Sequence, residues 1–286
     1  MRTIVITGAS DGIGAAAARL LAAQHPDDRL VLVGRNPQKT AAIAEAVGAE
    51  FFCADHSSLT DVRRLAQDLL AACDRIDVLA NNAGGIFDGP IITEDGFEQT
   101  FQINYLAPFL LTHELFPLLE KSNARIIMTS SLANVLFGRL DFDDLMGVKN
   151  YKTNRAYGTS KLADLLFARS LHHKFQHRGI SAVSFHPGVV LTNFAQESHG
   201  FLSRFYKNPL ASRSRLSISA EQGGKNLAYF IDGTPTITWQ SGVYYNDKLR
   251  PGVVNPLARS HRAADTLFAR TESMLGIHFG QPVDTK

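Results

Sequence analysis

Short apolar segments alternate with longer amphipathic ones through most of this 286-residue chain. The short segments are rich in β-branched and aromatic residues, as strands buried in a parallel sheet are. The longer segments repeat their apolar residues about every 3.6 positions, which is typical of helices. Strands that alternate with helices form right-handed βαβ units. The sequence therefore predicts an α/β fold, a doubly wound (Rossmann) parallel sheet of about seven strands with helices on both faces.

The expected elements can be placed along the chain. Buried parallel strands are predicted at Thr3–Thr7, Leu30–Val33, Glu50–Ala54, Val78–Asn81, Arg125–Thr129 and Ser181–His186, with a further strand at Gly242–Asn246. The clearest helices are Ile13–Gln24, Leu59–Ala72, Ala156–Phe175 and Ala220–Ile231, and a C-terminal helix is expected within 257–276. No linker, repeat or low-complexity tract precedes His186, so we expect residues 1–286 to form a single domain.

Periodicity fails between Val189 and Ser219, where Phe, Ser, Arg, Asn and Pro dominate. A gap of this length inside a domain is usually a substrate loop or lid rather than a plain connection. Aromatic residues of this loop and of two earlier segments could line an apolar pocket, or could pin the loop to the body or form a partner surface. They are Phe194, Phe201, Phe205 and Tyr206, with Phe87 and Phe137.

Composition excludes several classes of function. The net charge of +2, with His neutral, is too small for a nucleic-acid-binding field. Cys53, expected in a buried strand, and Cys73, at the end of the next helix, indicate a reducing compartment without a disulfide framework or metal site. No apolar run approaches the ~18 residues that cross a bilayer, and the N-terminus enters a strand directly. We expect a cytoplasmic protein without a membrane anchor.

A glycine-rich stretch joins the first strand to the first helix. Glycines there permit a tight turn, close approach to a pyrophosphate and close packing of helix on strand, and the helix N-terminus favours negative charge. A purely structural turn is the alternative, but the position within the first βαβ unit favours phosphate binding. The predicted contacts are Thr7, Gly8, Ser10, Asp11, Gly12, Ile13 and Gly14.

The second strand runs into Gly34-Arg35-Asn36. NAD-specific folds carry an acid near this point to bind the ribose 2′-hydroxyl, whereas a guanidinium suits a 2′-phosphate. Arg35 therefore predicts a preference for NADP(H), with NAD(H) not excluded. If Arg35 is only a surface residue, the preference is undecided.

Polar residues also end the third and fourth strands. Asp55 can reach an adenine amino group, and Asn81, Ala83 and Gly84 suit a turn whose backbone groups face a ligand at the carboxyl edge of the sheet. Either group could instead serve turn chemistry alone.

Tyr157 and Lys161 lie four residues apart, on one face of a predicted helix. A phenol ionises near pH ~10, and a nearby cation favours the phenolate, so the pair can act as an acid or base; a solvated helix stripe is the alternative. The fifth strand runs into Ser130 and Ser131, whose side chains face opposite sides if the strand continues. One of them can therefore hold a substrate oxygen beside Tyr157.

Taken together, these segments resemble the short-chain dehydrogenase/reductases. That family has a TGxxxGxG loop, an NNAG segment, a serine after the fifth strand, a YxxxK pair and a PGxxxT segment. The matching residues are Thr7–Gly14, Asn81–Gly84, Asn104, Ser131, Tyr157–Lys161 and Pro187–Thr192. The resemblance implies hydride transfer between the nicotinamide C4 and a carbonyl carbon or alcohol.

The resemblance also implies a role for each residue. Tyr157 would be the general acid in reduction or base in oxidation, and Lys161 would favour its phenolate and bind the nicotinamide ribose. Ser131 would polarise the carbonyl. Asn104 would link Lys161 to solvent through a water; the alternative is a helix residue bonded only to local backbone. The nicotinamide carboxamide would be held by Pro187, Gly188, Val190 and Thr192.

Within the family, the chain looks most like the retinol dehydrogenase and carbonyl reductase branch. The shared features are Cys53–Leu59, the long Ser131–Tyr157 separation filled by Asp141–Leu145, Ser241–Tyr245 and the C-terminal helix. This branch implies an apolar carbonyl or alcohol substrate and NADP(H), and family members often form homo-oligomers. Asp11 stands where NADP-preferring members often carry a basic residue, so the NADP(H) prediction depends on Arg35.

Other assignments were weighed against this one. The alternative function is a non-catalytic dinucleotide-binding sensor on the same fold, although such proteins usually lose the Tyr/Lys pair or the serine. His172, His173 and His177 have a metal-like spacing but no completing carboxylate, so we expect a solvated helix face and no metal site. His186 is either a packing residue or a substrate contact.

Overall fold

A seven-stranded sheet forms the centre of the computed structural model, which describes residues 1–190 and 217–280. Its strand order is β3-β2-β1-β4-β5-β6-β9 and every paired strand is parallel. The strands are β1 (Thr3–Thr7), β2 (Arg29–Gly34), β3 (Glu50–Cys53), β4 (Val78–Asn81), β5 (Arg125–Thr129), β6 (Ser181–Phe185) and β9 (Tyr244–Tyr245). The predicted doubly wound fold is confirmed.

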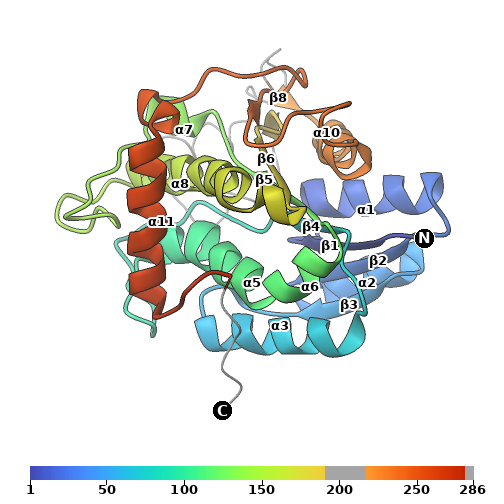
Figure 1. Ribbon diagram of the computed structural model, residues 1–286. Helices are drawn as coiled ribbons and strands as arrows, with labels where there is room; N and C mark the ends of the chain where they lie inside the picture. The colour runs from blue at the N-terminus through green and yellow to red at the C-terminus, as the bar shows by residue number, and fades with distance from the viewer. Residues whose placement is uncertain (191–216, 281–286) are drawn as a thin grey trace.

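Helices cover both faces of the sheet (Figure 1). One face packs against α1 (Gly12–Gln24), α2 (Pro37–Val47) and α10 (Ala220–Asp232). The other packs against α3 (Leu59–Ala72), α5 (Ala107–Glu114) and α8 (Thr153–Phe175). Each face buries its own apolar cluster, as the unbroken apolar character of the strands predicts.

Strand order reverses at β1, which pairs with β2 on one side and with β4 on the other. In open α/β sheets, ligands bind outside the carboxyl ends of the strands at such a reversal. Most segments singled out in the sequence follow carboxyl ends of strands, whereas Tyr157–Lys161 lies on α8 and Asn104 on η1. The topology brings the strand-end segments to one edge.

The other described helices are short or lie outside the sheet layers. They are α4 (Gln99–Phe101), the π-helix η1 (Gln102–Leu106), α6 (Phe116–Lys121), α7 (Ala133–Leu136), η2 (Gln176–Arg178), η5 (Pro256–Arg259) and α11 (His261–Leu275). Most are too short to show a helical period in sequence. Thr153 begins α8 three residues ahead of the prediction, and β9 keeps only the centre of the predicted Gly242–Asn246 strand.

The prediction of a buried third strand was wrong. β3 is the outermost strand and pairs only with β2, so one of its edges faces outward. Phe51 is 41% exposed, and Cys53 is half-buried rather than buried. Cys73 is buried at the end of α3, as predicted. A strand's place in the sheet depends on distant pairing, which local composition does not encode.

The irregular segment begins and ends at a small second sheet. There β7 (Val189–Val190) pairs in parallel with β8 (Ser217–Ile218). Thr192 and the aromatic residues of the segment, Phe194, Phe201, Phe205 and Tyr206, lie outside the described residues.

The C-terminal helix α11 packs against α8, beside α5 (Figure 1). Phe268 of α11 and Phe279 just beyond it contact Phe109 of α5 and Phe167 of α8, with ring centroids 5.1–6.2 Å apart. Such aromatic pairs contribute about 0.5–1.5 kcal/mol each beyond their buried area. These contacts fix α11 on the helices that carry the candidate site.

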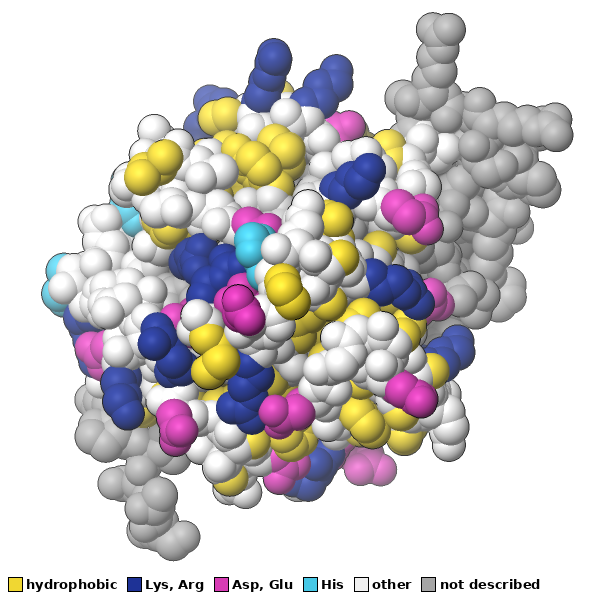
Figure 2. All heavy atoms as spheres, turned by 90° about the vertical axis from the view of Figure 1, so that its right-hand side faces the viewer, with side chains coloured by type: hydrophobic (Ala, Val, Ile, Leu, Met, Phe, Trp, Pro, Cys, Tyr) yellow, Lys and Arg dark blue, Asp and Glu magenta, His cyan; other side chains and the backbone are white. Residues whose placement is uncertain are grey.

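Surface charge is mixed. Figure 2 shows basic and acidic side chains interspersed over one face of the molecule, in keeping with the net charge of +2. Within residues 1–190 and 217–280, no helix has the length and apolar character needed to span a membrane.

The contact between α1 and α10 requires a glycine. A Cβ at Gly224 would lie 2.5 Å from the Ala16 Cβ and 2.8 Å from the Ala17 nitrogen. Helix propensity favours Ala over Gly by about 1 kcal/mol, whereas overpacking costs about 1–3 kcal/mol, and here the added Cβ would meet backbone.

We expect Gly224→Ala to lower the free energy of unfolding by about 1–2 kcal/mol in urea denaturation. Lys225→Ala, at the exposed neighbour, should change it by less than about 0.5 kcal/mol. Equal stabilities of the two variants would contradict the packing argument.

Candidate active site

A cavity of about 280 Å³ opens at the carboxyl edge of the sheet. Its wall contains most of the residues predicted from the sequence. They are Gly8, Ser10, Asp11, Gly12, Ile13, Arg35, Asp55, Ala83, Gly84, Ser131, Tyr157, Lys161, Pro187, Gly188 and Val190. The strand ends therefore bring segments far apart in sequence into one wall.

The glycine-rich turn needs its glycines. Gly8 and Gly12 have φ values of +67° and +55°, a region that favours glycine. A Cβ at Gly14, which lies behind the wall, would stand 2.3 Å from the Gly8 oxygen. The turn delivers the N-terminus of α1 to the cavity, where unpaired helical N–H groups can hold phosphate oxygens. The Asp11 carboxylate accepts a hydrogen bond from the Gly12 nitrogen at 2.7 Å, so it caps the same helix.

Thr7 supports the cavity without lining it. Its hydroxyl accepts hydrogen bonds from the Asn82 and Ala83 nitrogens, each at 3.0 Å. In return, Asn82 Nδ2 donates to the Thr7 oxygen at 3.0 Å, and the Thr129 hydroxyl donates to Asn82 Oδ1 at 3.2 Å. Thr7 and Asn82 thus join the ends of β1, β4 and β5.

Asn81 points away from the cavity. Strand alternation turns its side chain into the core, where Nδ2 donates to the Thr112 hydroxyl at 3.1 Å and lies 3.5 Å from Met128 Sδ. Asn82, the next residue, lines the cavity instead. The period of two along β4 was the signal that could have assigned the side chains correctly.

Asp55 makes the predicted turn contacts, and its contact with an adenine stays a prediction. Its Oδ1 accepts hydrogen bonds from the Ser57 nitrogen at 2.9 Å and the Ser57 hydroxyl at 2.8 Å, which is turn chemistry. The residue also lines the cavity, as Arg35 does at the end of β2.

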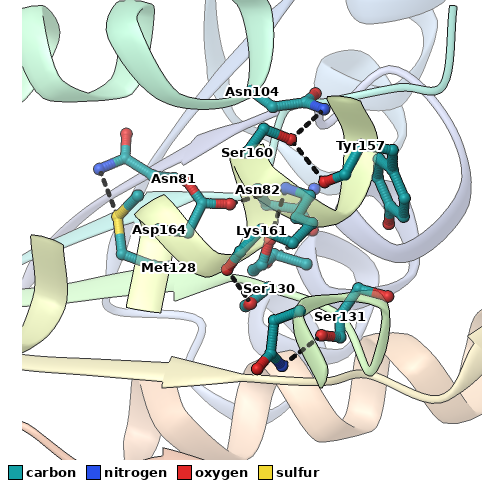
Figure 3. Close-up of polar contacts among 12 residues, drawn as sticks. Asn81, Asn82, Asn104, Met128, Ser130, Ser131, Tyr157, Ser160, Lys161 and Asp164 are labelled. Carbon is teal, nitrogen blue, oxygen red and sulfur yellow. Dashed lines mark hydrogen bonds and ion pairs between the residues drawn. The ribbon is translucent and has the colours of Figure 1, made fainter. Parts of the chain in front are cut away.

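Asn104 holds the β4 loop to α8. Its Oδ1 accepts from the Gly85 nitrogen at 2.8 Å, while Nδ2 donates to the Gly85 oxygen at 2.9 Å and to the Ser160 hydroxyl at 3.1 Å (Figure 3). The Ser160 hydroxyl donates in turn to the backbone carbonyl oxygen of Tyr157 at 2.8 Å. The alternative of a residue bonded only to local backbone was wrong, because Gly85 belongs to a different segment.

The two serines divide their tasks as their opposite orientation predicts. The Ser130 hydroxyl donates to the backbone oxygen of Lys161 at 2.7 Å and so ties β5 to α8. The Ser131 hydroxyl accepts a hydrogen bond from the Ala133 nitrogen at 3.2 Å, which leaves its own proton for another acceptor. Both residues are buried at the cavity wall.

Tyr157 lies at the cavity with its ring packed against Ile86, Ala133 and Phe137. The Lys161 ammonium is 6.0 Å from the ring centroid. Its Nζ donates to the Thr129 oxygen at 2.9 Å and pairs with Asp164 Oδ2 at 2.8 Å. The helix spacing therefore places phenol and cation together, as expected.

Comparison with known proteins decides the family. The family model described as short chain dehydrogenase matches residues 2–201. The chain belongs to the short-chain dehydrogenase/reductases.

Relatives in this family are named for alcohol or carbonyl chemistry. A Streptomyces sp. (strain C5) protein proposed to be a daunorubicin C-13 ketoreductase, DnrU, is 38% identical over 92% of this chain and 89% of its own. Human retinol dehydrogenase 13 is 32% identical over 96% of this chain and 85% of its own. An uncharacterised Mycobacterium Paratuberculosis protein of known crystal structure has a TM-score of 0.77 at 28% identity, covering 98% and 96% of the two chains. This chain is thus a short-chain oxidoreductase of the NAD(P)-dependent kind that acts on alcohol or carbonyl groups, with retinol dehydrogenase-like and ketoreductase relatives.

Two histidines at the cavity of this short-chain oxidoreductase are uncharged at neutral pH. Burial lowers the pKa of His186 to about 4, against a small opposing effect of Asp247. Burial likewise lowers the pKa of His56. Both rings line the cavity, and neither Nδ1 has a hydrogen-bond partner within the described ranges. His172, by contrast, is half-buried against Gly242, so the predicted solvated face holds only for His173 and His177.

Sequence reasoning missed part of the wall and one charged neighbour. The missed wall residues are Val33, Gly34, Ala54, His56, Asn82, Gly85, Ile103 and Thr129. Most of them are next to a predicted residue at the carboxyl end of a strand. The rule that ligands bind at these ends would have found them if the neighbouring positions had been included. Asp164 was missed because nothing local marks an acid on a helix as buried.

Loss of the Asn104 amide should destabilise the loop after β4. Asn104→Ala leaves the buried Gly85 N–H and C=O without partners, at a cost of about 1–3 kcal/mol each. We expect a fall of about 2–6 kcal/mol in the free energy of unfolding, measured by urea denaturation. Asn150→Ala, at an exposed position, should stay within about 0.5 kcal/mol of the wild type. A variant at 104 as stable as the one at 150 would show that this hydrogen bonding does not hold the loop.

Proposed function

We propose that this protein is an NADP(H)-dependent oxidoreductase that transfers a hydride between the nicotinamide and the carbonyl carbon of an apolar ketone or aldehyde, or the corresponding alcohol. The observation that carries the proposal is the convergence of Tyr157, Ser131 and Lys161 on the cavity that the glycine-rich turn also lines. Few structural reasons would bring a phenol, a hydroxyl and a buried ammonium to one strand edge.

The chain's own residues handle the proton. When bound, NADPH supplies the hydride, with its two electrons, to the carbonyl carbon. Tyr157 gives its phenolic proton to the carbonyl oxygen, so the product is a neutral alcohol. The Ser131 proton, not used by Ala133, stabilises the negative charge that develops on that oxygen. Lys161 favours the phenolate left behind and offers its remaining N–H to the nicotinamide ribose.

The cavity suits a dinucleotide along its length. Helix α1 supplies N–H groups for a pyrophosphate, and Pro187, Gly188 and Val190 line the same cavity as Ser131 and Tyr157. Gly34 lets α2 pack closely on the end of β2, just before Arg35, since a Cβ there would lie 2.3 Å from the Thr40 hydroxyl. The guanidinium of Arg35 then supports recognition of a 2′-phosphate.

Apolar side chains surround the reactive end. Phe87 lines the cavity, and Phe137 packs beside the Tyr157 ring. On the adjoining segment, Leu132 is 43% exposed and Leu136 is 62% exposed. Exposed apolar side chains beside a cavity favour an apolar ligand. All-trans-retinal and daunorubicin, a C-13 ketone, are therefore suitable probes, together with benzaldehyde and cyclohexanone.

Removal of the Tyr157 hydroxyl should stop turnover. With NADPH and the four carbonyl probes, the wild type should consume NADPH with at least one, and Tyr157→Phe should lose at least about 1000-fold in kcat. NADPH affinity, measured by fluorescence titration, should change less than about threefold. Substantial residual turnover would exclude Tyr157 as the proton donor. NADPH binding without turnover of any probe by the wild type would favour a non-catalytic sensor.

Arg35 provides a separate test of the cofactor. Arg35→Gln removes a charge-assisted bond worth about 1.5–3 kcal/mol, so the Kd for NADPH should rise about 10–100-fold while that for NADH stays within about threefold. Arg29→Gln, at the other end of β2, should leave both values unchanged. Tighter binding of NADH than NADPH by the wild type would contradict the NADP(H) preference.

A further inference from the structure

Asp164 is a buried acid that the proposed chemistry does not use. Its side chain is 1% exposed, and that of Lys161 is 4% exposed, so the pair is withdrawn from water. Oδ2 lies 2.8 Å from the ammonium, whereas Oδ1 has no hydrogen-bond partner within residues 1–190 and 217–280. A buried ion pair with an unsatisfied oxygen is a poor source of stability.

The ammonium is oriented by its two acceptors. Three N–H groups are available on Lys161, and the Thr129 oxygen and Asp164 Oδ2 each take one. The remaining N–H serves the cavity, which Lys161 lines. Asp164 and Thr129 thus fix the position of the ammonium at the cavity wall, beside Tyr157.

The carboxylate also opposes the lysine's charge. Tyr157 and Asp164 are seven residues apart on α8, which is about 10 Å along a helix. Both the cation and the anion act on the phenol through a buried, low-dielectric region. We propose that Asp164 is a positioning residue, the counterion that orients Lys161 and limits how strongly Lys161 activates Tyr157.

The charge state of Asp164 suits this role at neutral pH. Burial raises the pKa of Asp164 to about 6, against the opposing effect of Lys161, so the carboxylate is mostly ionised at neutral pH and above. No other charged group acts on it among the described residues.

Among the described residues, the groups that face the Lys161–Asp164 pair add no competing charge; Asp265 and His261 of α11 meet α8 at Lys174 and Arg169 instead. Tyr105 of η1 stays protonated, because burial raises the pKa of its phenol well above its usual range, and it bonds to Thr271 of α11 at 2.8 Å. His186, after β6, is neutral because burial lowers its pKa to about 4. β4 and β5 face the pair with Asn81, Met128 and the Thr129 carbonyl, none of which titrates (Figure 3).

The inference rests on the proposed function and is tested through the pH profile. Asp164→Asn keeps an acceptor for Lys161 but removes the negative charge. A unit charge about 10 Å away, at an effective dielectric of about 20, corresponds to about one pH unit. Without the carboxylate the phenolate costs less to form, so Tyr157 should lose its proton at lower pH. The falling limb of kcat for carbonyl reduction, and the rising limb for alcohol oxidation, should both move about one unit toward acid.

The assay uses NADPH and whichever of the four carbonyl probes the wild type reduces fastest, with kcat measured from pH 6 to 11. Asp77→Asn removes another buried carboxylate, one that binds Arg75 and the Thr3 nitrogen, and should leave the profile unmoved. If Asp164→Asn does not fold, Asp164→Ser also removes the charge and retains an acceptor.

Three outcomes separate the possibilities. The proposal is supported if the pH profile of kcat moves toward acid in Asp164→Asn and stays unmoved in Asp77→Asn. A profile within about 0.3 pH units of the wild type, or a shift toward alkali, overturns it, since the carboxylate then either does not reach Tyr157 or is needed to keep Lys161 charged. The proposed function is tested separately: it holds if the wild type turns over a carbonyl probe and Tyr157→Phe abolishes that turnover. A failure of the proposed function is therefore distinguished from a failure of the Asp164 proposal.

Discussion

The cavity depends on the hydrogen bonds that hold three strand ends together at the point where strand order reverses. The Thr7 hydroxyl donates to the Ala80 oxygen at 3.3 Å and accepts from the two nitrogens that follow β4. Asn82 closes the connection by bonding both Thr7 and Thr129. Without these bonds the buried polar backbone of the turns would lack partners once the strands end. The same atoms set the distance between the glycine-rich turn and the β5 end that leads to the serines.

Much of the fold could be read from the sequence because its signal is local. Apolar strands alternating with amphipathic helices indicate the sheet, and the rule that ligands bind beyond strand carboxyl ends gathers Gly8, Arg35, Asp55 and Tyr157 into one wall. What failed was set by tertiary pairing. The outer place of β3 depends on which strands it meets, and the shorter β9 depends on its contact with β6.

The site, like the fold, could be predicted only where its signal is local in the sequence. The short motifs mark where the cavity forms, but they do not tell a residue that lines it from one that supports it, since Thr7 and Asn81 stand in motifs and lie behind the wall. Asn104 bonds Gly85, which is remote in sequence, and Asn81 turns inward by strand alternation. Asp164 sits three residues after Lys161, a spacing that on most helices is a solvated ion pair. Only the burial of α8 on all sides distinguishes the Lys161–Asp164 pair from a solvated one.

That burial is completed by α11. The family model ends at residue 201, yet α11 carries Thr271, which bonds Tyr105, and Phe268, which packs on Phe109 and Phe167. These contacts keep water from the side of α8 that bears the Lys161–Asp164 pair. Part of the apolar cover around α8 is therefore supplied by a part of the chain outside the family match. Transplanting Tyr157, Lys161 and Ser131 into a relative that lacks this helix would carry over the cavity-lining side chains but not the packing that surrounds them here.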